Sequence, residues 1–260
     1  MQSSQPIKAP RTTHQGLVSN ITNLPENRQS TDNRRFITNE VKAKVELHTE
    51  LLSVYRNLLE CYGPQHWWPA NSPFEVMVGA ILTQNTAWTN VEKAISNLKA
   101  VDCLDPTRIA GMPTLDLGQL IKPSGYFNVK AKRLQALCIW YQENGGYRKL
   151  SQLDTVPLRQ ALLSVYGIGP ETADDILLYA FERPVFVIDT YTRRLFSRLE
   201  LFQKDLPYET MRTEFETALP ANSRLFSEYH ALIVSHGKDI CRNRPRCDGC
   251  CIRDICSYYG

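Results

Sequence analysis

The chain has 260 residues, of which 43% are hydrophobic and 22% are charged, so it can bury one large core or two modest ones. A net charge of +3 leans only weakly toward anionic partners. Apolar stretches such as ILLYAF and VFVI are far shorter than the ~20 residues of a membrane span, and no apolar secretion signal follows Met1. We therefore expect a cytoplasmic, globular protein.

The beginning of the chain differs from the rest in composition. Residues 1–38 are rich in Ser, Thr, Asn, Gln and Pro and show no apolar periodicity, which predicts a disordered N-terminal extension. From Val41 onward apolar residues recur at helical spacing, and prolines and glycines divide the pattern into segments of ~10–15 residues. Only VFVI at 185–188 resembles a strand. The predicted fold class is all-α, a compact bundle with short connections.

A tight hairpin is predicted between two helices, in the segment LLSVYGIGPETADDILLYAF. The first helix starts near Thr155 and the second at Pro170, with Gly167 and Gly169 between them. We expect both glycines to adopt positive φ and to let another backbone approach, while the first amides of the second helix point toward a phosphate. A dinucleotide fingerprint would follow a strand and would need a third glycine where Thr172 stands. A plain helical turn without a ligand remains the alternative.

Asp189 follows the apolar run VFVI and precedes an amphipathic helix. This position is typical of a helix N-cap. A helix N-terminus also keeps a carboxylate ionised, which is what a positive charge developing on a sugar ring requires. The two interpretations are compatible.

Five of the eight cysteines lie in one C-terminal segment, a pattern typical of a metal site. Cys241, Cys247, Cys250 and Cys256 have the spacing C-x5-C-x2-C-x5-C. Zinc sites usually present two CxxC knuckles, so a single one favours a [4Fe–4S] cluster over zinc. Cys251 remains an alternative third ligand. Several arginines, Arg244 among them, make this segment basic and suited to a phosphate backbone.

The glycine hairpin, the aspartate after the apolar run and the four-cysteine segment follow one another along the chain. In this order they resemble the endonuclease III superfamily of DNA glycosylases, and the resemblance covers roughly residues 41–260. The resemblance implies a helix-hairpin-helix fold with two domains: residues 66–183 as a six-helix domain, and 41–65 plus 184–260 as a helical domain carrying [4Fe–4S]. The cluster spacing is one residue shorter than the family's C-x6-C-x2-C-x5-C. The implied partner is double-stranded DNA with a damaged base, bound by a monomer associated with the nucleoid.

Site residues follow from the same resemblance. Asp189 corresponds to the catalytic aspartate, Gln84 in ILTQNTAW to the residue that fills the gap left by an extruded base, and Tyr126 in GYFNVKA to the wedge. Members with lyase activity carry a lysine where this sequence has Glu171. Because a carboxylate cannot form an imine, we expect a monofunctional enzyme in which water attacks the sugar. For Glu171 itself, an acid that interacts favourably with the helix dipole is preferred over a direct chemical role.

The base that is removed is predicted from the segment HWWPANSPFEVM, which resembles the 3-methyladenine glycosylases of the superfamily. Cation–π attraction of roughly 0.5–2 kcal/mol would favour an alkylated purine stacked on Trp67, Trp68 or Phe74. Adenine glycosylases have a catalytic glutamate where this chain has Gly79. Packing between domains is the alternative role of the two tryptophans, and Trp88 has no assigned place.

Two other functions remain open at this point. One is an endonuclease III-like glycosylase and lyase for oxidised pyrimidines that uses another amine, Lys130 or Lys238, residues otherwise expected to contact DNA. The other is a non-catalytic DNA-binding protein that keeps the hairpin, with Gly167 and Gly169, and the cluster for phosphate contact. Retention of Asp189 argues mildly against the second.

Overall fold

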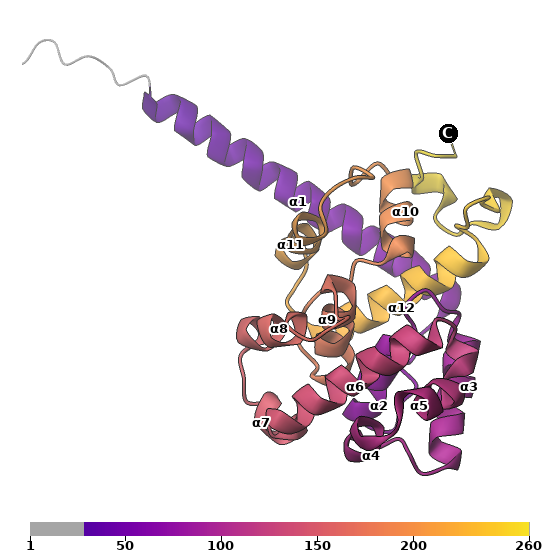
Figure 1. Cartoon of the computed structure of the whole chain (residues 1–260). Coiled ribbons are helices and arrows are strands. Elements are labelled where there is room, and N and C mark those ends of the chain that lie inside the picture. The colour runs from indigo at the N-terminus through magenta and orange to yellow at the C-terminus, as the bar shows by residue number, and fades with distance from the viewer. Residues whose placement is uncertain (1–28, 260) are drawn as a thin grey trace, which may run out of the picture. The chain divides into compact units, whose positions relative to one another are not determined.

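The computed structural model describes the backbone of residues 29–259 and the side chains of residues 42–259. The chain divides into two units, residues 1–42 and 43–260, and the fold below is that of the second unit (Figure 1). Every regular element in the described residues is helical, which confirms the all-α prediction. None of these helices is both long and apolar enough to cross a membrane.

The helices of the described chain are as follows. They are α1 (Gln29–Tyr62), α2 (Pro73–Leu82), α3 (Trp88–Ala100), α4 (Pro106–Gly111), α5 (Thr114–Leu120), η1 (Lys122–Ser124), α6 (Phe127–Glu143), α7 (Gly146–Leu150), α8 (Thr155–Leu163), α9 (Pro170–Asp175), the π-turn η2 (Ile176–Ala180), α10 (Thr190–Arg198), α11 (Tyr208–Ala218), α12 (Ser223–Asp239), η3 (Cys247–Gly249) and η4 (Arg253–Ile255).

The predicted N-terminal extension, residues 1–38, lies mostly outside the described residues. Its described part begins at Gln29 and is helical, because α1 runs from there to Tyr62. This differs from the predicted disorder. The stretch from Gln29 to Tyr62 contains no proline or glycine, the two residues that most disfavour a helix interior.

Side-chain caps fix where several helices begin. Ser72 accepts a hydrogen bond from the Glu75 amide at 3.2 Å, and Pro73 follows as the first residue of α2. Asn222 caps α12 in the same way by accepting from the Leu225 amide at 3.0 Å. These caps satisfy amides that have no partner within the helix, so the short connections between helices end at defined residues.

Two groups of helices form the packed body of the second unit. In the first, α4 and α5 pack on α6, and α2 packs on α3 and η2; in the second, α10 packs on α12. The core around α12 is aromatic: Phe186 stacks on Phe215 with ring centroids 4.1 Å apart, and Phe196 meets Phe215 edge-on at 4.8 Å. The Tyr229 hydroxyl donates to the Leu51 carbonyl at 2.8 Å and so ties α12 to the second half of α1.

The segment Val185–Ile188, predicted as a short strand, is buried but pairs with no strand in the described chain. The strand prediction is therefore wrong. A side chain takes the place of a neighbouring strand: the Phe186 amide donates to Glu216 Oε1 at 2.9 Å. The backbone can thus remain extended in the core without a sheet, because its buried polar groups still find partners.

A buried ion-pair network fixes the short helix α9. Asp174 is fully buried and accepts from Arg159 of α8, with Nε–Oδ1 at 2.7 Å and Nη2–Oδ2 at 3.0 Å. The hydroxyl of Tyr208 in α11 donates to the same carboxylate at 2.9 Å. Since α9 also carries Glu171 and Asp175, this network sets the direction in which those two side chains point.

Candidate functional site

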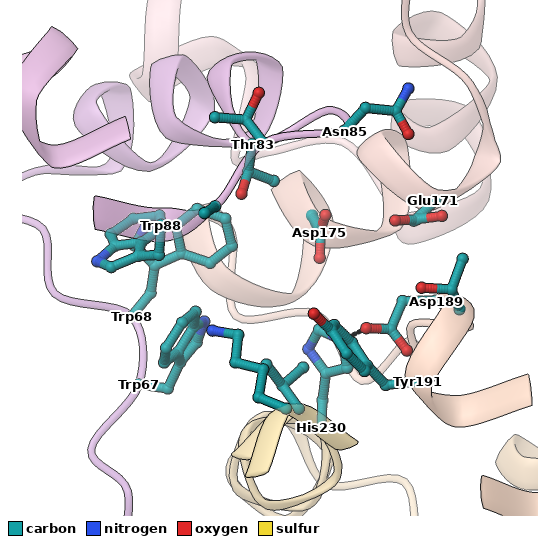
Figure 2. Close-up of a pocket in the computed structure, with 15 residues that line it drawn as sticks. Trp67, Trp68, Thr83, Asn85, Trp88, Glu171, Asp175, Asp189, Tyr191 and His230 are labelled. Carbon is teal, nitrogen blue, oxygen red and sulfur yellow. Dashed lines mark ion pairs between the residues drawn. The ribbon is translucent and has the colours of Figure 1, made fainter. Parts of the chain in front are cut away.

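A cavity of about 540 Å³ gathers residues from five separate segments (Figure 2). The aromatic rings of Trp67, Trp68 and Trp88 form one wall, Glu171 and Asp189 lie on the opposite side, and Asp175 stands between them. The remaining lining residues are Thr83, Asn85, Thr86, Ala87, Thr190, Tyr191, His230, Val234 and Lys238. An apolar wall that faces several convergent acids is typical of a ligand site.

Asp189 is the N-cap of α10, as predicted, and it faces the cavity. Its Oδ1 accepts from the amide and the hydroxyl of Thr192, at 2.7 and 2.8 Å, and its Oδ2 lies 3.7 Å from Nε2 of His230. Burial disfavours the carboxylate, but the contacts with His230 and Thr192 outweigh it and hold the pKa of Asp189 below its ordinary value. The cavity therefore contains a fixed negative charge near one wall.

Glu171 is the second residue of α9 and opens into the same cavity. The residue is exposed to solvent on its outer side, so burial of its carboxyl group is incomplete. The pKa of Glu171 is raised to about 7. The larger cause is partial burial and the smaller one is the negative charge of Asp189, while His230 and Arg193 lower the pKa and offset part of this effect. Near neutral pH this carboxyl group is present in both its protonated and its ionised form, whereas Asp189 stays ionised.

The tryptophans pack against one another in the aromatic wall. The ring of Trp68 lies 5.1 Å from that of Trp88 and 5.1 Å from that of Tyr179, measured between centroids. Gly79 of α2 sits beneath Trp68, because a Cβ atom at this position would lie only 3.1 Å from the indole. A side chain at position 79 would push against Trp68, so the glycine allows the ring to pack closely on the helix.

Asp175 and His230 line the cavity but were not singled out by the sequence analysis. Asp175 is 5% exposed, and its Oδ1 has no hydrogen-bond partner among the described residues. His230 of α12 is also buried and holds its ring by a 2.7 Å contact between Nδ1 and the Tyr179 hydroxyl. Both residues lie inside helices, where a single polar residue carries no sequence signal; only tertiary packing turns them toward the cavity.

The hairpin between α8 and α9 forms as predicted, with one difference. Gly167 has φ of +85°, and a Cβ there would lie 2.3 Å from Cγ of Arg133, so glycine is required both for the conformation and for the contact. Gly169, in contrast, has φ of −95° and ψ of 179° as the N-cap of α9. The prediction of positive φ at Gly169 is wrong, because an extended N-cap suffices to start the helix.

Gln84 lies against this hairpin and does not line the cavity. Its amide donates to the Gly167 carbonyl at 3.0 Å and to the Thr172 hydroxyl at 2.9 Å, and its oxygen accepts from Arg133. The next residue, Asn85, has φ of +53° and faces the cavity rim. Because the backbone turns left-handed after α2, Asn85 lines the cavity and Gln84 does not. Asn tolerates this conformation better than most residues, so its presence here was the sequence signal for the turn.

Three other predicted residues lie away from the cavity lining. Phe74 is 9% exposed and packs on Tyr141 in the core, with ring centroids 5.6 Å apart. Lys130 is 1% exposed, and its Nζ donates to the carbonyls of Leu82 and Ser124 at 2.7 and 2.8 Å. The expected DNA contact of Lys130 is not available in this conformation, since its ammonium is used inside the fold. Tyr126 is 71% exposed, at the N-cap of α6.

Lys238 lines the cavity, and its Nζ lies 5.5 Å from the centroid of the Trp67 ring. A basic groove of about 520 Å³ continues from there. Its lining includes Arg244, together with Thr190, Tyr191, Arg194, Gly237, Lys238, Arg242 and Asn243. The predicted pair Lys238 and Arg244 is thus brought together beside the cavity, in a groove with a positive charge.

The C-terminal cysteines lie close enough for their charges to interact. The pKa of the Cys250 thiol is raised, mainly because the thiol is partly buried and additionally because of the charges of Cys241, Cys256 and Cys247. No group of three or more His, Cys, Asp or Glu side chains among residues 42–259 is arranged to hold a single metal ion. Cys251 is exposed, and its thiol is hydrogen-bonded to the free thiol of Cys61.

The chain matches known proteins over most of its length. The family model described as HhH-GPD superfamily base excision DNA repair protein matches residues 78–221. A candidate DNA repair glycosylase of Methanocaldococcus jannaschii is 46% identical over 209 residues, which are 79% of this chain and 95% of that protein. Endonuclease III of Sulfolobus acidocaldarius is 31% identical over 188 residues, 72% of this chain and 82% of that protein.

One solved structure with this fold is the 3-methyladenine DNA glycosylase of H. pylori bound to 1,N6-ethenoadenine. It superposes with a TM-score of 0.62 at 30% identity and covers 75% of this chain and 97% of that one.

Proposed function

The chain belongs to the HhH-GPD superfamily of base excision DNA repair proteins, and we propose that it is a monofunctional DNA glycosylase that releases alkylated purines such as 3-methyladenine. The observation that carries this proposal is the pairing of two carboxylates, Asp189 and Glu171, with a tryptophan wall across one cavity. An extruded nucleotide would place its sugar beside the acids and its base against the rings. Extrusion is needed because the glycosidic carbon is inaccessible in stacked duplex.

Asp189 supplies the charge on the sugar side. As the bond to the base breaks, positive charge develops on the sugar, and the ionised, buried carboxylate of Asp189 stabilises it. Water then attacks the sugar carbon, with Asp189 helping to orient it. Glu171 stands where the lyase members have an amine; because a carboxylate forms no imine, the reaction ends with hydrolysis.

The tryptophan wall supplies the binding energy on the base side. A purine alkylated at N3 or N7 is cationic, so contact with the faces of Trp67, Trp68 or Trp88 would add roughly 0.5–2 kcal/mol per ring contact. Such a base already leaves readily, so the fixed charge of Asp189 is sufficient. We propose Trp88 for the base-stacking role that the sequence analysis gave to Phe74, because Phe74 packs in the core.

DNA binding is assigned to the surface around the cavity. The hairpin at Gly167 and Gly169 would contact the phosphate backbone, and the groove with Lys238 and Arg244 would continue that contact. Asn85, at the rim, is better placed than Gln84 to fill the gap left by an extruded base. Exposed Tyr126 remains the proposed wedge.

The C-terminal segment is proposed to hold a [4Fe–4S] cluster on Cys241, Cys247, Cys250 and Cys256. The donor set fits: thiolates are the usual ligands of such clusters, and Cys250 lies close enough to Cys241, Cys256 and Cys247 for their charges to raise the pKa of its thiol. The thiol of Cys251 is hydrogen-bonded to that of Cys61 instead, which favours Cys250 as the third ligand. When bound, the cluster would fold the basic loops between its ligands.

Absorbance near 400 nm, with iron and without zinc, tests the cluster. Cys251→Ser should keep the absorbance and Cys250→Ser should lose it. The reverse result would exchange the two ligands. We propose the two domains that the family resemblance implies: residues 66–183 as the hairpin domain, and residues 41–65 plus 184–260 as the cluster domain.

A second activity has one observation in its favour. Lys238 lines the cavity, so its amine could attack the sugar of an oxidised pyrimidine nucleotide and form a Schiff base, as an endonuclease III-like lyase would. Lys130 is less suited to that role, because it is buried and fully hydrogen-bonded. Borohydride trapping separates the two activities, since the monofunctional enzyme forms no covalent adduct with DNA.

The deciding experiment measures free bases released from alkylated, oxidised and mismatched duplexes, together with strand nicking. We expect 3-methyladenine to be released from methylated DNA without nicking. Release of oxidised pyrimidines with a trapped adduct would favour the lyase. A protein that binds DNA but releases no base from any of the duplexes would be the non-catalytic binding protein.

A further inference from the structure

Asp175 is a buried acid in which one carboxylate oxygen has no hydrogen-bond partner among the described residues. It is 5% exposed, its Oδ1 is enclosed, and the described residues offer that atom no hydrogen bond. The adjacent acid, Asp174, has a structural role: its carboxylate accepts two hydrogen bonds from Arg159 and one from Tyr208. A buried polar atom without a partner costs free energy, so packing alone does not account for Asp175.

Its position in the cavity points to a ligand. Asp175 stands between the tryptophan wall and the pair Glu171 and Asp189 (Figure 2). If the sugar of an extruded nucleotide lies beside Asp189 and the base lies against the rings, then Asp175 faces the part of the base nearest the glycosidic bond. This step rests on the proposed function.

We propose that Asp175 is a general acid that delivers a proton to a ring nitrogen of an extruded neutral purine as its glycosidic bond breaks. The electron pair of the broken bond goes to the base, the proton of Asp175 neutralises the base, and Asp175 is left as a carboxylate. The sugar cation is stabilised by Asp189 and captured by water, which releases one proton to solvent. A proton from solvent then restores Asp175, so the net reaction is hydrolysis.

The electrostatic surroundings support a protonated Asp175 in the resting enzyme. Burial first, and then the charges of Glu171, Asp189 and Asp174, raise the pKa of Asp175 well above its ordinary value. The titratable groups around it are Glu171 and Asp174 on its own helix, Tyr179 on η2, Asp189 and Tyr191 at the start of α10, and His230 and Lys238 on α12. None of them donates a hydrogen bond to Asp175 within the described residues.

The proposal extends the range of substrates. A cationic alkylated purine leaves as a neutral base and needs no proton, so it depends on Asp189 alone. A neutral purine leaves as an anion unless it is protonated. Gly79 offers no acid of its own and is pressed against Trp68. Asp175 would therefore let one cavity release both classes of purine.

The test compares Asp175→Asn with the wild type on two kinds of duplex under single-turnover conditions. One is DNA methylated with dimethyl sulfate, scored by release of 3-methyladenine; the other carries hypoxanthine or 1,N6-ethenoadenine. We expect release of the neutral purines to fall by about 100-fold or more, and to fall much further than release of 3-methyladenine, since general acids contribute roughly 10²–10⁴-fold. The wild-type rate for neutral purines should also fall at alkaline pH relative to that for 3-methyladenine, and the variant should lose this difference.

Each other outcome has a defined meaning. Equal losses on both duplexes, or no loss on neutral purines, would overturn the role of Asp175, as would a wild type that releases 3-methyladenine but neither neutral purine. A wild type that releases no base at all would overturn the proposed function instead. The melting temperature of Asp175→Asn is the folding control, and Asp175→Ser serves as a second variant if the amide does not fold.

Discussion

Asp189→Asn separates the charge of this residue from its packing. The amide oxygen of Asn can still accept from the Thr192 amide and hydroxyl, which lie 2.7 and 2.8 Å from Oδ1. Asn and Asp cap helices about equally well, so α10 should still begin at Thr190. The change removes the negative charge beside His230, whose Nε2 is 3.7 Å from Oδ2.

The expected loss follows from one charge interaction. A sugar cation about 4 Å from the carboxylate gains about 4 kcal/mol at an effective dielectric constant of about 20. Each 1.36 kcal/mol corresponds to about a tenfold change in rate, so the rate of base release should fall about 1,000-fold. Loss of capping should contribute only a few tenths of a kcal/mol to any change in stability, because Asn caps a helix about as well as Asp.

The assay is single-turnover release of 3-methyladenine from methylated DNA, with duplex affinity and melting temperature measured in parallel. Asp105→Asn is the matched control: Asp105 caps α4 by accepting from two backbone amides at 2.9 and 3.0 Å, but it lies outside the cavity lining. We expect Asp105→Asn to release base at the wild-type rate. Undiminished release by Asp189→Asn would refute the electrostatic argument.

Three further predictions concern stability. Because the pKa of Glu171 is raised from 4.5 to about 7, its ionisation opposes folding and stability should fall as the pH rises through this interval; Glu171→Gln should therefore melt higher than wild type at pH 8 but not at pH 4. Gly167→Ala should lower the unfolding free energy by at least ~1–2 kcal/mol for the left-handed backbone, whereas Gly169→Ala, in extended backbone, should be nearly neutral in chemical denaturation. Asp174→Ala should lower the unfolding free energy in the same measurement, by less than the about 3–5 kcal/mol of a fully unpaired buried charge, because Arg159 keeps Glu209 as a partner at 2.7 Å; equal stability would contradict the network.

The parts of the fold and site that the sequence predicted have local causes. Helical spacing, capping residues and the Gly167 turn act within a few residues, so the all-α class and the hairpin could be read directly. Asp189 was found because a polar residue between an apolar run and a helix has few local explanations. Trp67 and Trp68 were found only by resemblance, since two adjacent tryptophans carry no periodic signal.

The errors and omissions depend on tertiary packing. Gln84 and Asn85 are neighbours, and a left-handed residue after α2 decides which one faces the cavity. The strand at 185–188 failed because Glu216, on a distant helix, satisfies the extended backbone. Asp175 and His230 lie within helices, so their approach to Asp189 depends on how α9 and α12 pack. No pattern of a few residues contains that information.

Three carboxylates around one cavity repel one another when all are ionised, and their different surroundings favour a different protonation state for each. Asp189 has the Thr192 donors and His230, which favour its anion; Asp175 has burial and no donor, which favour its acid form; Glu171 lies between, with a pKa of about 7. Since the charge of Asp189 helps to raise the other two, Asp189→Asn should lower the pKa of Glu171, visible by carbon NMR titration with Glu171→Gln as the assignment control. A Glu171 titration that does not move would mean that burial alone sets its pKa, and that the acids of this cavity act independently.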